Sequence, residues 1–393
     1  MNYIGSKFKL LGEIEAILGR HQVRRDQTFC DVFSGTSIVA QWAKQQGFQV
    51  ISNDMQGYSY ALQMAFVATN AWPDFAKLRR HEPVIAQGLE ALRAAHASGP
   101  EAVQVGPTFG LASGNPSDLP REALPLLAVL RFLERLPPSK GRFFEQYCEG
   151  GEAGRQYFSR ENGQACQAVR DALGRWQQAG WLSDEEFHVL LASLLESMDA
   201  VANTASVYGA FLKRLKRSAR QTLRLKLPVL LPSSLPQRAY QRDAVALLQE
   251  LASEGELGVL YVDPPYNRRQ YHTNYHLLET IARWDLDAFE PVGVTGLRAD
   301  AEAPSAFTRG SQATQAMATL ISQARCRHLL LSYSNEGLIS EADLIAMLDA
   351  KSPSGVREYK RIPYKRFRAD RNHAERHYPH DEVEEFLFYL QVG

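Results

Sequence analysis

The chain has 393 residues, of which 45% are hydrophobic and 22% charged, a globular composition that excludes disordered, collagenous and coiled-coil proteins. Lysine plus arginine and aspartate plus glutamate number 44 each, so the net charge of the whole chain says nothing about its partners. At roughly 150 residues per domain, the length predicts two or three domains.

No targeting segment or membrane span is indicated. The longest strongly apolar run, residues 124–130, is far shorter than the ~18 to 20 residues of a membrane helix. The first seven residues lack the basic-then-apolar pattern of a secretory signal. The cysteines lie far apart, without a C-x-x-C pair or a disulfide framework, at Cys30, Cys148, Cys166 and Cys326. We therefore expect a protein of a reducing cytoplasm with no membrane partner.

The first part of the chain predicts a parallel sheet. Apolar residues recur at helical spacing over 8–19. The segment after it predicts a strand, a small-residue turn, a helix that ends at Gly47 and a second strand, over 28–33, 34–37, 38–46 and 48–52. A β-turn-α-β unit of this kind is typical of parallel sheets.

Helical patterns dominate the middle of the chain, for example over 124–136 and 184–198. A proline-rich connector at 228–236 ends this part. Strand patterns then return, around an amphipathic helix over 341–348, at 257–262, 328–333 and 383–391. We expect one α/β domain built from residues 1–60 and 239–393, with residues 61–238 as a mainly helical insertion.

The strongest chemical signal is Asp263-Pro264-Pro265-Tyr266, directly after the apolar strand over 257–262. Two consecutive prolines fix the backbone and hold the flanking groups rigidly. In an open parallel sheet, ligands bind at the carboxyl ends of the strands. A carboxylate, proline carbonyls and an aromatic ring at that edge are suited to hold a planar heterocycle by its exocyclic amine.

A second signal is the turn Ser34-Gly35-Thr36-Ser37, with Asp54 at the end of the next strand. A turn of small residues allows a ligand to approach the backbone closely, and the following helix N-terminus supplies N–H donors. An acidic residue about 20 positions on is suited to bind ribose hydroxyls. This geometry fits a dinucleotide as well as a single nucleoside.

The combination of motifs resembles the DNA adenine methyltransferases, in the motif order of the alpha group. The motifs are Tyr3-Ile4-Gly5-Ser6-Lys7, Phe33-Ser34-Gly35-Thr36, Asp54, Tyr240-Gln241-Arg242-Asp243 and Asp263-Pro264-Pro265-Tyr266. The resemblance covers residues 1–60 and 239–393, and it extends to Tyr266–Tyr271 and Glu384–Tyr389. It implies a Rossmann-like α/β domain with a mainly parallel seven-stranded sheet, and a target-recognition role for the helical insertion.

The resemblance also implies the roles of individual residues. Tyr3 and Lys7 would contact the methionine end of S-adenosylmethionine, above a turn formed by Phe33, Ser34, Gly35 and Thr36. Asp54 would bind the ribose, Asp243 would lie near the adenine of the cofactor, and Asp263 would also contact the cofactor. Asp263, Pro264, Pro265 and Tyr266 would be catalytic, accepting from the target amine and stacking on the base. The family has glycine at position 37; because serine prefers a negative φ, we expect a differently placed loop.

Methylation of an adenine amine requires alignment rather than a covalent intermediate. No cysteine follows a proline, which argues against a cytosine ring-carbon methylase. A base in a duplex must be flipped out to be reached, and phosphate contacts must offset the cost. We expect double-stranded DNA to contact two basic segments, 213–226 and 357–376, and the tetrapeptide's flank, with candidates Lys213, Arg214, Lys216, Arg217, Arg220, Asn267, Arg269, Tyr271, Lys365, Arg366 and Arg368.

Other functions stay open at this point. The acceptor could be the cytosine N4 amine or adenine in RNA, or the chain could be a non-catalytic DNA-binding homologue. A nicotinamide-dependent oxidoreductase would use the Gly35 turn but would leave the tetrapeptide unexplained. Two histidine pairs, His272/His276 and His373/His377, have helical spacing but no third ligand, so we expect no metal. We further expect a nucleoid-associated monomer or weak dimer and a companion restriction endonuclease as partner.

Overall fold

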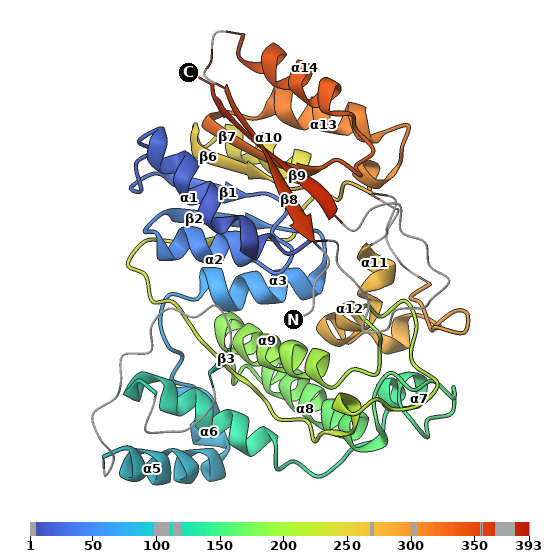
Figure 1. The fold of residues 1–393 in the computed structure, drawn as a ribbon. Coiled ribbons are helices and arrows are strands. Elements are labelled where there is room, and N and C mark those ends of the chain that lie inside the picture. Colours follow the sequence, from blue (N-terminus) through green and yellow to red (C-terminus); the bar gives the residue numbers. More distant parts are fainter. Residues whose placement is uncertain are drawn as a thin grey trace. The chain divides into compact units, whose positions relative to one another are not determined.

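The computed structural model describes residues 5–97, 111–112, 119–267, 271–299, 305–353, 355, 357–365 and 382–392 (Figure 1). The chain forms two compact units. The α/β unit comprises Tyr3–Gln63, Leu235–Asn274 and Ala301–Gly393, and the helical unit mainly Met64–Ser234 and Tyr275–Asp300. Residues 275–300, which the sequence pattern grouped with the C-terminal part of the chain, thus belong to the helical unit by their contacts.

Seven strands of the α/β unit form one sheet in the order β5-β2-β1-β6-β7-β9-β8. Their bounds are Thr28–Asp31 (β1), Gln49–Asn53 (β2), Arg238–Tyr240 (β5), Leu257–Val262 (β6), Cys326–Ser334 (β7), Arg357–Lys365 (β8) and Glu382–Gln391 (β9). The strands β5, β2, β1, β6 and β7 pair in parallel, whereas β9 is antiparallel to both β7 and β8. The expected mainly parallel seven-stranded sheet is confirmed.

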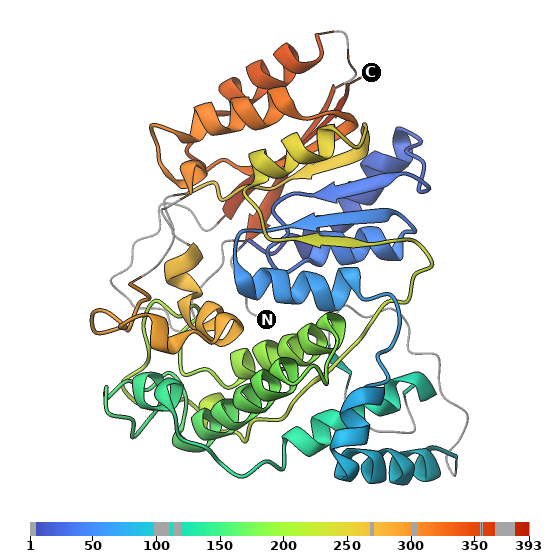
Figure 2. The ribbon, with the colours of Figure 1, turned by 180° about the vertical axis from the view of Figure 1, so that it is seen from behind.

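Helices cover both faces of this sheet, as Figures 1 and 2 show. On one face, a buried cluster joins alternate residues of β1, β6, β7 and β9 to helices α10 (Ala244–Ala252), α13 (Ala313–Gln323) and α14 (Glu341–Lys351). On the other face lie helices α1 (Leu11–Arg20) and α2 (Ile38–Gln45), where Phe29 of β1 packs against Trp42. Every residue of β6 is buried, as expected for a strand covered on both sides. Helices α3 (Gly57–Gln63) and α11 (Tyr271–Asn274) complete the unit.

Two strands of the sheet were missed by sequence reasoning. β5 has only three residues, all half-buried, so it offers no apolar run to detect. In β8, Tyr359 and Tyr364 are interspersed among basic residues, and sequence reasoning assigned this pattern to DNA contact. Tyr359 of β8 stacks on Phe388 of β9, with 4.5 Å between ring centroids, and thereby attaches this edge strand to the sheet.

The helical unit contains most of the remaining helices. They are α4 (Ala76–His81), α5 (Pro83–Ala97), α6 (Leu124–Leu133), α7 (Arg142–Tyr147), α8 (Arg160–Gln178), α9 (Asp184–Ala200) and α12 (His276–Arg283). A short antiparallel pair, β3 (Leu111–Ala112) and β4 (Leu227–Pro228), lies beside them. Single turns of 3-10 helix occur in both units. In the α/β unit they are Lys7–Leu10 and Ala306–Thr308, and in the helical unit Arg121–Ala123, Ser218–Arg220 and Leu286–Ala288. The helical unit also has a π-helical turn at Met64–Ala68. The helices expected over 124–136 and 184–198 are confirmed as α6 and α9.

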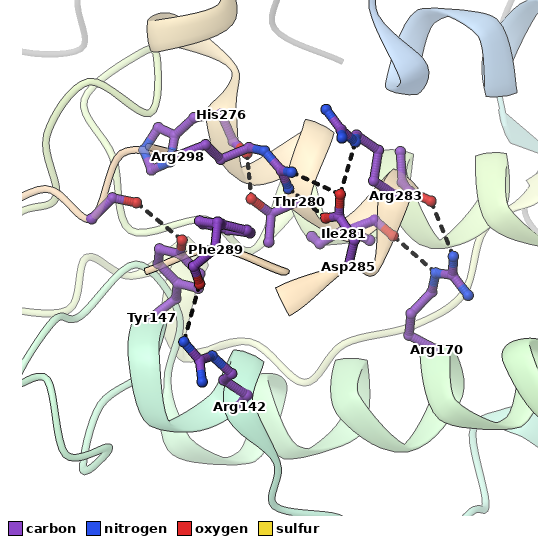
Figure 3. Close-up of polar contacts among 12 residues, drawn as sticks. Arg142, Tyr147, Arg170, His276, Thr280, Ile281, Arg283, Asp285, Phe289 and Arg298 are labelled. Carbon is purple, nitrogen blue, oxygen red and sulfur yellow. Dashed lines mark hydrogen bonds and ion pairs between the residues drawn. The ribbon is translucent and has the colours of Figure 1, made fainter. Parts of the chain in front are cut away.

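Buried polar contacts attach residues 275–300 to the helical unit, as Figure 3 shows. Arg170 of α8 donates to the last carbonyls of α12, at Ile281 (2.9 Å) and Ala282 (3.0 Å). Arg298 forms a bidentate pair with Asp285, at 2.7 and 2.8 Å. Because buried polar groups are costly unless paired, this network accounts for the place of the segment in the helical unit.

Among the described residues, no helix combines the length and apolarity needed to cross a bilayer. The cysteines are all unpaired and buried. Burial raises the pKa of each thiol above its ordinary value, so these side chains are packing residues rather than nucleophiles.

Candidate active site

The candidate site lies at the carboxyl edge of the sheet, within the α/β unit. The register pairs Asp31, the last residue of β1, with Ser52 of β2 and with Tyr261 of β6. The segments that follow the three strands therefore emerge side by side, at the edge where parallel sheets bind ligands. Asp31 interacts electrostatically with both Asp54 and Asp263. The two motifs that the sequence singled out thus share one edge.

Asp54 is fixed by backbone amides of the turn that follows β1. One carboxylate oxygen accepts from the Gly35 N–H at 2.9 Å, and the other accepts from the Gln56 N–H at 3.0 Å. Burial raises the pKa of Asp54 above its ordinary value, although these hydrogen bonds act in the opposite direction. These contacts hold the Asp54 carboxylate in place beside the turn.

The turn itself has two left-handed residues, Gly35 (φ 52°) and Ser37 (φ 63°). The expectation that Ser37 would keep a negative φ is wrong, because the loop retains the conformation that a glycine favours there. The Ser37 side chain is fully buried, and its hydroxyl has no hydrogen-bond partner among the described residues. The turn is held by the Ser34 N–H, which donates to Asn53 O at 2.8 Å.

A buried ion-pair cluster surrounds Asp263. The Lys7 ammonium lies 3.2 Å from a carboxylate oxygen of Asp263 and 3.2 Å from one of Glu385 on β9. Lys7 and Glu385 are each only 3% exposed, and the Asp263 side chain is 15% exposed. The ammonium also lies 5.1 Å from the centre of the Tyr266 ring, within cation–π range. Two residues distant in sequence, Lys7 and Glu385, therefore converge on the tetrapeptide.

Burial and neighbouring charges perturb the pKa values of Lys7, Asp31 and Asp263. Burial and the nearby Glu385 raise the pKa of Asp263 to about 7, although Lys7 acts to lower it. Burial and the charge of Asp263 raise the pKa of Asp31 to about 8. Burial would lower the pKa of Lys7, but Asp263 and Glu385 outweigh it and raise that pKa well above its ordinary value. Carboxyl groups with pKa values near neutrality are typical of functional sites.

The remaining residues of the predicted site have the following places. Phe33 packs edge-on against Phe307 at 5.1 Å, and Thr36 O accepts from Gln41. Pro264 is buried, while Pro265 and Tyr266 are half-buried, with Tyr266 edge-on to Tyr333 at 5.9 Å. Asp243 caps helix α10 by accepting from two of its backbone N–H groups, each at 3.0 Å. Tyr3 lies outside the described residues.

Sequence reasoning left three residues of this edge without a role. Asp31 lies in the strand predicted over 28–33 and Glu385 in the segment Glu384–Tyr389, but neither was given a part in the site. Asn53 links the two cofactor motifs: its amide donates to Val32 O at 3.0 Å and to Arg242 O at 3.1 Å. A polar residue at the end of an apolar strand was the available signal for Asp31 and Asn53. Glu385 had none, because its partner Lys7 is 378 positions away.

The predicted DNA-contacting residues fall into three groups. In the helical unit Lys213, Arg214, Arg217 and Arg220 are exposed, whereas the Lys216 ammonium donates to Thr204 O at 2.7 Å. In β8 the basic residues before position 365 pair with carboxylates of the same unit: Arg357 with Asp349, Lys360 with Glu13 and Arg361 with Glu341. Asn267 is half-buried; the side chains of Tyr271 and Lys365, and all of Arg269, Arg366 and Arg368, lie outside the described residues.

Comparison with known proteins adds independent information. Residues 3–90 and 127–347 match the family described as D12 class N6 adenine-specific DNA methyltransferase. The chain is 35% identical over 380 residues to the Type II methyltransferase M.NlaIII of Neisseria lactamica, covering 96% of this chain and 95% of that protein. It is 31% identical over its whole length to the modification methylase StsI of Streptococcus sanguinis and to the Type II methyltransferase M.FokI of Planomicrobium okeanokoites. It spans only 52% of each of these two longer proteins.

Proposed function

Since the chain belongs to the D12 class N6 adenine-specific DNA methyltransferases, we propose that it moves the methyl group of S-adenosylmethionine to the N6 amine of an adenine flipped out of double-stranded DNA. The observation that carries this proposal is the buried Asp263, held by Lys7 beside Tyr266 at the same edge as the Gly35 turn. A nucleoside cofactor bound at that edge would have Asp54 and Asp263 on the same side of the sheet.

The residues at this edge fit a cationic cofactor. Asp31 has a buried carboxylate oxygen without a hydrogen-bond partner among the described residues. Among the described residues, Lys7 pairs with Asp263 and Glu385, and Asp31 interacts electrostatically with Asp263 and Asp54, so carboxyl groups are concentrated at this edge. S-adenosylmethionine, when bound, supplies a methyl group activated by a positively charged sulfur. Asp31 would accept from the ammonium of its methionine part, and Asp54 from its ribose hydroxyls.

The protein's contribution to the reaction is to hold and polarise the amine. An adenine N6 lone pair is delocalised into the ring, so the amine is a poor nucleophile. Asp263 and the Pro264 carbonyl would accept its two hydrogens and stabilise the positive charge that develops on nitrogen. Tyr266 would stack on the base and fix its plane. Because its pKa is about 7, the Asp263 carboxylate can also take up the proton that the amine loses.

The helical unit is proposed to bind and read the duplex. Its exposed residues Lys213, Arg214, Arg217 and Arg220 are suited to contact phosphates, which position a protein on DNA. These contacts would offset the few kcal/mol needed to extrude a base. The segment Tyr275–Asp300 belongs to the same unit, so we assign it to target recognition together with residues 61–238.

Labelled S-adenosylmethionine and duplex DNA test this function directly. The wild-type protein is expected to transfer label, and nucleosides from the product should contain N6-methyladenine by mass. Asp263→Asn keeps the side-chain shape but removes the charge, and it should lower kcat by at least ~10²-fold with cofactor binding retained. Label found on cytosine, or only on RNA, would show that the methyl acceptor is not adenine in DNA. Unchanged activity of Asp263→Asn would reject the assignment of the tetrapeptide.

Relatives named modification methylase or Type II methyltransferase support a place in restriction and modification. We propose a companion restriction endonuclease that cuts the same unmethylated site, action at the nucleoid of a cytoplasm, and a monomer or weak dimer. Resistance of methylated host DNA to cleavage by that endonuclease would support the pairing. Light scattering at micromolar concentration measures the oligomeric state.

A further inference from the structure

The antiparallel direction of β9 brings Glu385 to the candidate active site. Because β9 runs against β7, its first residues lie at the edge where β6 and β7 end, and Glu385 pairs with Ser334, the last residue of β7. Its carboxyl group is buried from solvent, and that burial raises its pKa. A buried carboxyl group is costly, so an isolated one is not expected without a partner.

Glu385 contacts two of the residues that act at the tetrapeptide. Its carboxylate lies 3.2 Å from the Lys7 ammonium and accepts a hydrogen bond from the Tyr266 hydroxyl. Lys7 in turn lies 3.2 Å from Asp263. Glu385 thus contacts Lys7 and the Tyr266 hydroxyl, and Lys7 links it to Asp263.

We propose that Glu385 is a positioning residue for methyl transfer, which shares the Lys7 ammonium with Asp263 and holds the ring of Tyr266 by its hydroxyl. This inference rests on the proposed function. An ammonium has three N–H donors, and at 3.2 Å from each carboxylate it is divided between them. Without the charge of Glu385, Lys7 would move onto Asp263 and compete with the target amine for the same oxygens.

The charges around Asp263 give this role a distinct pH signature. Lys7 reaches Asp263 from the turn before α1, Asp31 from β1 and Glu385 from β9, while Tyr261 and Tyr266 belong to its own segment. Removing the charge of Glu385 removes a repulsion and strengthens the pairing with Lys7, so the pKa of Asp263 falls. In a plot of kcat against pH, the rise on the acidic side should therefore occur at lower pH; this rise is called the acid limb below.

Glu385→Gln and Glu384→Gln form a matched pair of variants. Both remove one negative charge from the same strand, and the amide oxygen at position 385 can still accept from the Tyr266 hydroxyl. Glu384 is 42% exposed and points away from the cluster, with Arg361 3.9 Å distant. We expect Glu385→Gln to lower kcat roughly 10- to 100-fold at pH 8 and to move its acid limb to lower pH. Glu384→Gln should match the wild type.

If Glu385→Gln alone folds poorly, comparing Lys7→Gln with the Lys7→Gln/Glu385→Gln double variant keeps the test decisive, because the double variant removes both charges of the buried ion pair. Lys7→Gln should move the acid limb to higher pH, and adding Glu385→Gln should then lower kcat little further. Additive losses would overturn the role, as would a Glu385→Gln profile that coincides with that of Glu384→Gln. If the wild type and Glu384→Gln methylate no adenine, the proposed function itself fails.

Discussion

Replacing Asp31 with asparagine removes a buried carboxyl group without changing the size of the side chain. Burial and the charge of Asp263 raise the pKa of Asp31 to about 8, whereas an unfolded chain has the ordinary value of 3.8. Between these pH values the folded protein holds a proton that the unfolded chain has released. Stability therefore falls as pH rises through this window, because the native state binds more protons.

The size of this effect follows from the two pKa values. Their difference corresponds to roughly 5–6 kcal/mol of destabilisation at pH 8 and above. Asparagine never ionises and so avoids this cost, but its amide leaves a buried hydrogen-bonding group unpaired, at ~1–3 kcal/mol. We expect Asp31→Asn to be more stable than the wild type by about 3 kcal/mol at pH 8, and no more stable at pH 4.

Urea denaturation at pH 8 and pH 4, followed by circular dichroism, measures this difference. Asp287→Asn, at an exposed position, serves as the control and should change stability at neither pH. Calorimetry should show at least ~10-fold weaker binding of S-adenosylmethionine to Asp31→Asn, because a charged acceptor is lost. A variant less stable than the wild type at pH 8, or a stability difference independent of pH, would refute the reasoning.

Three further outcomes are expected. Ser37→Gly should raise the free energy of unfolding by about 1 kcal/mol, since glycine accepts φ 63° and the unpaired buried hydroxyl is removed; an unchanged urea midpoint would contradict this. Arg217→Ala should weaken duplex binding on all sequences alike and reduce the slope of log K against log salt by about 1, as fluorescence anisotropy would show. Arg298→Ala should destabilise the helical unit by ~2–4 kcal/mol because Asp285 loses its bidentate partner. Hydrogen exchange measures this, and α12 amides as well protected in the variant as in the wild type would argue against it.

Local patterns in the sequence predicted the centre of the fold correctly. The apolar run of β6 and the β1-turn-α2-β2 unit depend on hydrophobic periodicity and turn chemistry, which are properties of neighbouring residues. The order of the motifs then placed Asp54 and Asp263 at one edge. Each of these features depends on a few residues in succession, and such features can be predicted from a single chain.

The features that escaped sequence reasoning depend on packing between distant segments. β8 was taken for a DNA-contacting run because its basic residues are indistinguishable, in sequence, from free cations; in the structure Lys360 is paired with Glu13. The apolar face of α12 does not specify which unit buries it, and residues 275–300, which the sequence pattern grouped with residues 239–393, belong by contact to the helical unit. One carboxylate oxygen of Asp31 is buried without a hydrogen-bond partner among the described residues. This depends on which side chains surround it, and no sequence pattern predicts it.

The contact between Lys7 and Glu385 has a consequence for biosynthesis. The two residues are 378 positions apart, so during translation the ammonium is made long before its second carboxylate. In a nascent chain that ends before β9, Lys7 could pair with Asp263 but not with Glu385. The Lys7 ammonium is therefore shared between two carboxylates only after position 385 has been synthesised and β9 has joined the sheet.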